Sequence, residues 1–335
     1  DDAAASVVRG GREVRSNVIA SQIDVHKAYG GVVPEIASRK HVEAILPVID
    51  RALREASCKG RDTDLISVTC GPGLIGALLV GVCAAKGLAS VWEKPVIGVN
   101  HIEGHILANL IGNPDLEPPF ISLVVSGGHS HLILVSEDYS YETVARTRDD
   151  AAGEAFDKIA REAGLGYPGG PLIDIAAESG DPTAFVFPRT RFPDGSLDFS
   201  FSGLKTAALN HLNKIRMISK SHNLSATNEL SLNDFAASFR SAVVSVLVDH
   251  TMEAVKRYGM DTVCVAGGVA ANSLLRKRIG EEAGKAGIRV FIPDRIYCTD
   301  NAAMIACAGT YSYFKGNRDD MDLNAFASLS PGAKH

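Results

Sequence analysis

Short apolar runs alternate along the chain with longer segments of helical periodicity. Residues 65–69 and 96–99 have the length and composition of buried strands, and residues 35–56 repeat apolar side chains at helix spacing. The turn Gly71-Pro72-Gly73 separates the first strand from a helix predicted over residues 74–91. This succession of strand, turn, helix and strand predicts an α/β fold with helices packed on a sheet.

The second half of the chain repeats this pattern. Predicted strands end at glycine turns, one at Ser126-Gly127-Gly128 and another at Gly267-Gly268, and the helix after the second turn opens at Ala270-Ala271-Asn272. The other expected elements are a hairpin over residues 1–20 around Gly10-Gly11, strands over 120–125, 131–135, 262–266 and 290–293, and a helix over 233–258. The recurrence predicts duplicated sheets flanked by helices in two lobes, the actin-like and sugar-kinase-like (ASKHA) architecture.

The predicted boundary between the lobes is the polar, proline-rich segment 113–119. We expect an N-terminal lobe of residues 1–112 plus 301–335 and a C-terminal lobe of residues 113–300. The nucleotide and metal site is expected between them.

Composition is that of an ordinary globular protein, with 335 residues, 46% hydrophobic and 22% charged. The net charge of −5 gives no general attraction to nucleic acid, so a polyanion would need a local basic patch or a partner. The six cysteines include no Cys-x-x-Cys pair and indicate buried thiols in a reducing compartment. The apolar run over residues 74–85 is about 12 residues long, too short to cross a bilayer, and we expect no membrane association.

Two histidines four positions apart begin a predicted helix in Asn100-His101-Ile102-Glu103-Gly104-His105. One helical turn separates them, so the two imidazoles can share a metal ion, although such a pair also occurs as a helix cap or a buried polar pair. Asp300 opens another predicted helix, where it is an N-cap candidate and a candidate third ligand. A His-His-Asp set leaves metal positions open for substrate, as in catalytic sites.

Several acidic and glycine-rich positions fit a nucleotide. The Ser126-Gly127-Gly128 turn can aim backbone N–H groups at a phosphate, although a plain hairpin turn has the same sequence. Asp157 and Asp174 lie at the starts of predicted helices, where they are capping residues or ligands of sugar hydroxyls. Asn272 follows the second glycine turn and can donate hydrogen bonds to a base or ribose.

Ordered motifs along the whole chain resemble one family, the tRNA adenosine threonylcarbamoyltransferase (TsaD-type) family. They are the His-x-Glu-Gly-His pair, Ser126-Gly127-Gly128-His129, Gly153-Glu154-Ala155-Phe156-Asp157-Lys158, Gly166-Tyr167-Pro168-Gly169-Gly170-Pro171, Gly267-Gly268-Val269-Ala270-Ala271-Asn272 and Cys298-Thr299-Asp300-Asn301. The stretch from Tyr29 to Glu35 resembles the bacterial and organellar branch. In this family a strand with a Thr-Ser-Cys motif precedes the Asp-Asp pair found here at Asp1-Asp2, so we expect a strand before Asp1.

The resemblance implies transfer of a threonylcarbamoyl group from threonylcarbamoyl-AMP to the N6 amine of the tRNA adenosine 3′ of the anticodon. It implies that His101, His105 and Asp300 bind Fe²⁺ or Zn²⁺, and that no further catalytic side chain is needed. Residues implied to bind the adenylate are Val124, Val125, Ser126, Gly127, Gly128, Asp157, Gly170, Asp174 and Asn272.

Partners and location also follow from the resemblance. Bacterial members work with a non-catalytic paralogue and a small P-loop ATPase in the cytoplasm, whereas mitochondrial or plastid members act as homodimers.

Two other classes of protein were considered. In a zincin metalloprotease the glutamate directly follows the first histidine, whereas Glu103 stands two residues after His101. An ATPase or kinase of the same architecture would bind Mg²⁺ through oxygen ligands, whereas two of the three ligands in a His-His-Asp set are imidazole nitrogens.

Overall fold

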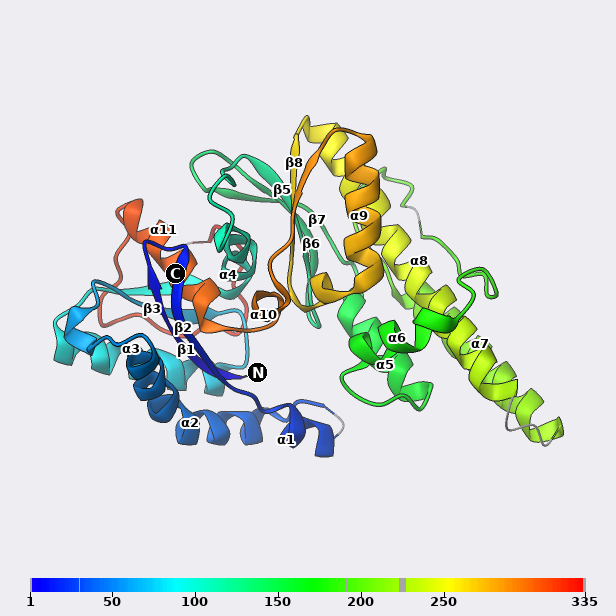
Figure 1. Ribbon diagram of the computed structural model, residues 1–335, viewed down its shortest axis with the longest axis horizontal. Coiled ribbons are helices and arrows are strands. Elements are labelled where there is room, and N and C mark those ends of the chain that lie inside the picture. Colours follow the sequence, from blue (N-terminus) through cyan, green and yellow to red (C-terminus); the bar gives the residue numbers. More distant parts are fainter. Residues whose placement is uncertain (1, 30, 191, 223–226, 334–335) are drawn as a thin grey trace. The chain divides into compact units, whose positions relative to one another are not determined.

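The structure, a computed structural model, describes residues 2–29, 31–190, 192–222 and 227–333. Figure 1 shows the order of its helices and strands. Contacts between residues divide the chain into two compact units: unit 1 is Asp1–Glu117 with Pro293–His335, and unit 2 is Pro118–Ile292. Unit 2 is thus a single continuous segment inserted in unit 1. The predicted lobe limits, at 112/113 and 300/301, stay a prediction.

Two pairs of strands form the sheets of unit 1. β1 (Ala3–Arg9) and β2 (Glu13–Ala20) are antiparallel, as predicted for the hairpin around Gly10-Gly11. β3 (Ile66–Gly71) and β4 (Val96–Asn100) are parallel, and α3 (Ile75–Trp92) is the crossover that a parallel pair requires. All five residues of β4 are buried, which places the start of the following helix deep in unit 1.

Helices cover these strands. α2 (Pro34–Glu55) packs on β1 and β2, α3 packs on β3 and α2, and α11 (Ala302–Phe314) contacts β1, β3, β4 and α4 (His101–Leu107). The smaller helices of this unit are α1 (Ile23–Ala28), η1 (Gly60–Asp62), η2 (Ala108–Leu110) and α10 (Arg295–Cys298). After α11 the chain runs along β3, where Phe326 N donates to Cys70 O at 2.7 Å.

The sheet of unit 2 has five strands in the order β7-β6-β5-β8-β9. Its central strand β5 (Phe120–Val125) is buried throughout and pairs antiparallel with β6 (Ser130–Val135) and parallel with β8 (Thr262–Ala266). The edge strands are β7 (Tyr141–Arg146) and β9 (Arg289–Phe291). Unit 1 has the same hairpin and parallel pair, but among its described residues no strand joins them.

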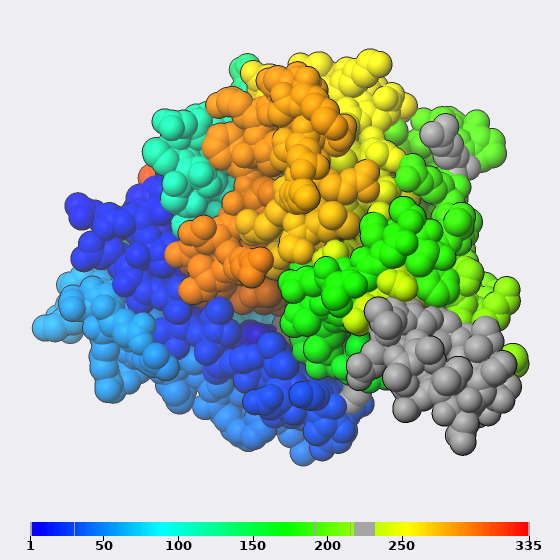
Figure 2. Space-filling view, turned by 45° about the vertical axis from the view of Figure 1, so that its right-hand side comes forward, coloured from blue at the N-terminus to red at the C-terminus, as the bar shows by residue number. Residues whose placement is uncertain are grey.

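Helices α8 (Thr227–Tyr258) and α9 (Ser273–Lys285) lie side by side, with α8 against β5 and α9 against β9 (Figures 1 and 2). The other helices of unit 2 are α5 (Ala152–Glu162), α6 (Gly169–Ala176), η3 (Ala177–Ser179), α7 (Ser202–His222) and η4 (Gly268–Ala271). Edge-to-face contacts of Phe239 with Phe156 and Phe187 fasten α8 to α5 and to the segment between η3 and α7. The predicted α/β class is confirmed.

Helix α3 is long and apolar enough, by length and composition, to cross a membrane, with a mean hydropathy of 1.7. Only 22% of it is buried inside the chain, although it packs on β3 and α2. A single helix of this kind is weak support for a membrane span, because buried helices also meet the same criterion.

Candidate active site

The two histidines project from α4 because of the way this helix begins. Asn100, the last residue of buried β4, is its N-cap, and its Oδ1 accepts hydrogen bonds from Ile102 N at 2.9 Å and Glu103 N at 3.4 Å. The Asn100 Nδ2 donates to Leu329 O at 3.2 Å, which attaches the cap to the C-terminal segment. The start of α4 is therefore fixed on both sides.

His101 and His105 lie one turn apart, with ring centroids 4.6 Å from each other. His105 is 2% exposed, and neither of its ring nitrogens has a hydrogen-bond partner among the described residues. Burial lowers the pKa of His105, which favours the neutral imidazole that binds metals. A buried neutral imidazole beside a carboxylate is suited to bind a metal ion.

Asp300 completes the cluster from the segment before α11. Its Oδ1 lies 3.4 Å from the Nε2 atoms of both His101 and His105, and one ligand atom from each residue falls within 4.8 Å of the others. Two ligands about 2.1 Å from a tetrahedral ion would lie about 3.4 Å apart, so this spacing fits one shared ion. Burial alone would raise the pKa of Asp300, but the two histidines outweigh it and hold the pKa well below its usual value.

Asp300 is not the N-cap of α11, so this prediction was wrong. The cap is Asn301, whose Oδ1 accepts a hydrogen bond from Met304 N at 3.0 Å. An amide at the cap leaves the adjacent carboxylate turned toward the histidines. Glu103, which we did not assign to the chemistry, accepts a hydrogen bond from Gly332 N at 2.7 Å through its Oε1.

The Ser126-Gly127-Gly128 turn of unit 2 is held close to two other segments. Ser126 O accepts a hydrogen bond from Gly153 N of α5 at 3.2 Å, and a Cβ atom on Gly153 would lie 2.5 Å from that oxygen. At Gly267, with φ +88°, a Cβ would lie 2.3 Å from Val125 O. Only glycine permits either approach, so the three backbones converge at the carboxyl ends of β5 and β8, where ligands bind in α/β sheets.

Asp157 and Gly170, which we predicted as adenylate ligands, belong to the middle of α5 and to the first turn of α6. Neither Asp157 nor Asp174 lies at the start of its helix, so that part of the prediction was wrong. Asp157 Oδ1 accepts a hydrogen bond from Gly169 N at 2.7 Å. Burial raises the pKa of Asp157, although hydrogen bonds from the backbone of Gly169 and Gly170 oppose the shift. The carboxylate thus joins α5 to the first turn of α6.

Asp174 and Asn272 are also in contact: Asn272 Nδ2 donates to Asp174 Oδ1 at 3.0 Å. Asn272 opens α9 as its N-cap, as predicted, whereas Ala270 and Ala271 lie outside this helix. A 3-10 turn, η4, comes first, and Asn272 caps α9 by accepting a hydrogen bond from Leu275 N at 3.0 Å. Two further residues bind the Asp174 carboxylate, Arg240 and Ser273, and we did not predict either. The sequence offered one signal, a charged Arg240 among the apolar positions of α8.

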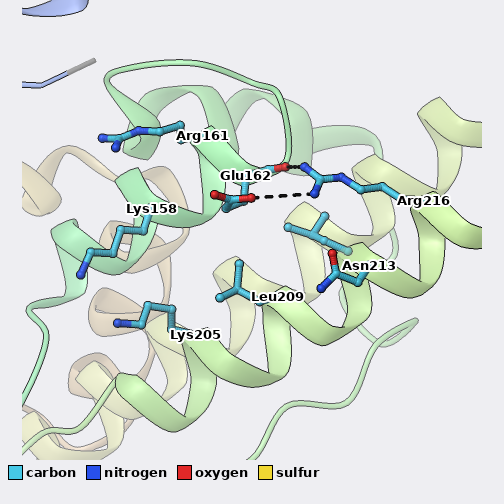
Figure 3. A pocket seen from close by; sticks show the side chains of 8 residues that line it. Lys158, Arg161, Glu162, Lys205, Leu209, Asn213 and Arg216 are labelled. Carbon is cyan, nitrogen blue, oxygen red and sulfur yellow. Dashed lines mark hydrogen bonds and ion pairs between the residues drawn. The ribbon is translucent and has the colours of Figure 1, made fainter. Parts of the chain in front are cut away.

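A separate cavity of about 460 Å³ lies between α5 and α7 in unit 2 (Figure 3). Its rim carries four cations, but Lys158 and Lys205 pair with Asp150, and Arg216 pairs with Glu162. None of the predicted site residues lines this cavity; the lining residues are Lys158, Arg161, Glu162, Lys205, Leu209, Leu212, Asn213 and Arg216. Because most of its charge is neutralised, we assign it no ligand.

The fold and the His-His-Asp cluster define an α/β protein of the actin-like class with a candidate metal centre. HypF in its phosphate- and nucleotide-bound form has the same fold, with a TM-score of 0.58 at 13% identity over 81% of this chain and 49% of HypF. HypF of T. kodakarensis has a TM-score of 0.58 at 14% identity, over 81% and 43% of the two chains. This chain therefore spans about half the length of those structures, and the likeness shows the fold.

The sequence identifies the family. Residues 13–307 match the tRNA N6-adenosine threonylcarbamoyltransferase family. Enzymes of that name from Clostridium perfringens and Clostridium botulinum are 53% and 54% identical, each over 334 residues, 100% of this chain and 96% of the relative. The chain belongs to this family and is a transferase, as the motifs predicted.

Proposed function

We propose that this enzyme transfers the threonylcarbamoyl group from threonylcarbamoyl-AMP to the N6 amine of the tRNA adenosine 3′ of the anticodon, assisted by a divalent metal ion. Family membership supports the reaction, and the observation that carries the metal is the 3.4 Å spacing of Asp300 Oδ1 from both imidazoles. The donor set of two imidazoles and one carboxylate suits Fe²⁺ or Zn²⁺.

His101, His105 and Asp300 would hold the ion, which would supply Lewis acidity at the carbamoyl group of the donor. The role of the protein is then to position the reactants, which can account for a large part of a rate enhancement. Asn100 and the C-terminal segment keep α4 in place, so the two imidazoles keep one geometry. No general base is assigned, because the Glu103 carboxylate is turned to Gly332.

Unit 2 would bind the adenylate. Val124 to Gly128 form the end of β5 and its turn, where backbone N–H groups without side chains can approach a phosphate. Asp157 and Gly170 would hold one edge of the nucleotide and Asp174 and Asn272 its ribose, since the structure brings each pair together.

A protein partner is part of the proposal. Large apolar side chains are exposed on α2 and α3, two helices that pack on each other: Val42 (63% exposed), Leu46 (63%), Ile75 (45%) and Leu79 (39%). We call these four side chains the α2–α3 face. We propose that a non-catalytic paralogue covers it in a bacterial cytoplasm, together with a small P-loop ATPase, and a homodimer is the other outcome of the test.

A transfer assay tests the reaction. Purified protein, synthetic threonylcarbamoyl-AMP and unmodified tRNA are incubated with and without a chelator, and the modified nucleoside is measured by mass spectrometry. We expect product that is lost on chelation and restored by Fe²⁺ or Zn²⁺, either from the protein alone or after the bacterial partner proteins are added. Absence of product in both cases would favour the ATPase alternative.

A further inference from the structure

Arg240 is a buried cation in the middle of α8, with a side chain 11% exposed. Its Nη1 donates to the Oδ1 of Asp174 at 2.7 Å and to the carbonyl oxygen of the same residue at 3.1 Å. Its Nη2 donates to Ala177 O at 3.3 Å, and Nη1 also lies 3.4 Å from Ser273 Oγ. One guanidinium thus joins α8 to the end of α6, to η3 and to the start of α9.

The two oxygens of Asp174 are unequally occupied. Oδ1 accepts three hydrogen bonds, from Arg240 Nη1, from Asn272 Nδ2 at 3.0 Å and from Ser273 Oγ at 3.0 Å. Oδ2 accepts one, from Ser273 N at 3.0 Å. A carboxylate offers about four acceptor positions, two on each oxygen. The three donors around Oδ1 must share its two positions and leave none free, whereas Oδ2 keeps one.

Stability alone is a weak reason for this arrangement. The Nε of Arg240 is buried and has no hydrogen-bond partner among the described residues, which costs free energy. Buried ion pairs can often be replaced by apolar side chains of similar size without loss of stability. Arg240 leaves its own Nε without a partner among the described residues, yet it binds the Asp174 carboxylate. This combination fits a role in orienting that carboxylate.

We infer that Arg240 and Ser273 are positioning residues that hold Asp174 so that its Oδ2 accepts a hydrogen bond from a single ribose hydroxyl of the adenylate. This inference rests on the proposed role of Asp174 in binding the donor. Because Oδ2 has a single free acceptor position, Asp174 can pair with only one of the two ribose hydroxyls. An analogue without that hydroxyl leaves this partly buried position unpaired. The loss of a hydrogen bond to a charged group should weaken the binding of such an analogue by about tenfold or more.

The test measures binding of AMP, 2′-deoxy-AMP and 3′-deoxy-AMP to the purified full-length protein by isothermal titration calorimetry. We expect wild-type protein to bind one deoxy analogue about tenfold or more weakly than AMP, and Asp174→Asn to abolish that difference. Arg240→Met should abolish it as well, although Asp174 is intact. In the transfer assay the Arg240→Met variant should raise KM for the donor with kcat within about threefold of wild type.

The matched control is Arg278→Met. Arg278 also joins α9 to α8, through a hydrogen bond from its Nη1 to Ser245 Oγ at 2.5 Å, but it has no contact with Asp174. This variant should keep the wild-type difference between AMP and the analogues. Arg240→Lys, which keeps the charge but has one nitrogen in place of the fork, should keep part of the difference.

Folding is checked by circular dichroism, and a second variant covers the case in which Arg240→Met does not fold. The double change Arg240→Met with Asp174→Asn removes both charges, and its affinity for AMP should match that of Asp174→Asn within about twofold. A folded Arg240→Met protein that still binds one deoxy analogue more weakly than AMP would overturn the inference. The inference would also fail if both deoxy analogues bind wild-type protein more weakly than AMP and Asp174→Asn abolishes both differences. If instead Asp174→Asn binds every nucleotide like wild type, the proposed role of Asp174 is wrong.

Discussion

His105 shows how a single side chain can require a ligand. The buried imidazole lies 3.4 Å from Asp300 Oδ1 without a hydrogen bond of good geometry, and a metal ion shared with that carboxylate would satisfy it. We expect His105→Ala to lower metal content by at least about tenfold while the fold is retained, measured by inductively coupled plasma mass spectrometry and circular dichroism.

His41→Ala is the matched control for this prediction. His41 is also buried in unit 1, at 8% exposed, but its Nδ1 lies 2.9 Å from Gln22 Nε2 and 2.7 Å from Ala37 O. Its loss should cost stability and leave the metal content unchanged. Equal metal content in the His105 variant and in wild type would refute the proposed triad.

For single residues, the sequence predicted which residue types form the site better than it predicted which residues they contact. His101, His105 and Asp300 lie together as expected, because histidine pairs at helix spacing and a nearby carboxylate are visible in the sequence. The capping role given to Asp300 belongs to Asn301, since two adjacent residues can both cap a helix and only packing decides between them. Arg240 and Ser273 were missed because their partner Asp174 is distant in sequence.

Among the elements, α5 and α7 are joined by one partly buried carboxylate. Asp150 pairs with Lys205 of α7 and Lys158 of α5, and its side chain is 16% exposed. Burial would raise the pKa of Asp150, but the two lysines outweigh it and lower the pKa. We expect Asp150→Asn to lower the free energy of unfolding by about 1–3 kcal/mol at pH 7.

This loss should depend on pH. A carboxylate whose pKa is lower in the folded state contributes stability above its unfolded pKa, about 3.9, and loses it as the pH falls through the folded value. The difference between variant and wild type in urea unfolding should therefore shrink below about pH 4. Glu142→Gln, at an exposed position on β7, is the control and should change little at either pH, and a deficit independent of pH would contradict the assignment.

The α2–α3 face predicts an effect on association. Leu46→Lys and Leu79→Lys place charges on apolar side chains that are already exposed, so the fold should be kept and binding to a partner or second copy should weaken by about tenfold or more. Analytical ultracentrifugation measures this. Met217→Lys, which changes an apolar side chain 72% exposed in unit 2, should have no effect.

The elements missed from the sequence had different causes. β7 is an edge strand with only Ala145 buried, so no alternating pattern marks it. Helix α7 does have a buried stripe of Leu204, Ala208 and Leu212 at helical spacing, but we predicted no helix for this segment. Strands β4, β5 and β8 were found correctly because every residue in them is buried and nearly all are apolar.

For the molecule as a whole, all three proposed metal ligands belong to unit 1, and so does the only tryptophan of the sequence, Trp92. Metal binding should therefore stabilise unit 1, by about 2.7 kcal/mol when the free ion is 100 times its Kd. We expect a chelator to lower the unfolding midpoint seen by Trp92 fluorescence and to leave the labelling of buried Cys264 in unit 2 unchanged. An Asp300→Asn protein should show no such shift, and a shift that persists in this variant would argue against the site.

The two-part architecture was predictable because strands and glycine turns recur in both halves of the chain. The grouping of Asp300 with the histidines in one unit was not, since spacing in the sequence says nothing about which segments return to the same core. The family motifs supplied that pairing by resemblance, and the structure places the three side chains together.

The insertion of unit 2 into unit 1 has a consequence for synthesis on the ribosome. Domains generally fold as they emerge, so the segment that carries His101 and His105 is made first and all of unit 2 follows before Asp300 appears. A nascent chain stopped at residue 292 would contain every proposed adenylate residue and both imidazoles but not Asp300, the third proposed metal ligand. We therefore expect tight loading of the proposed metal site only after Asp300 has emerged, and chains that are cut short before it should leave the ribosome without the metal.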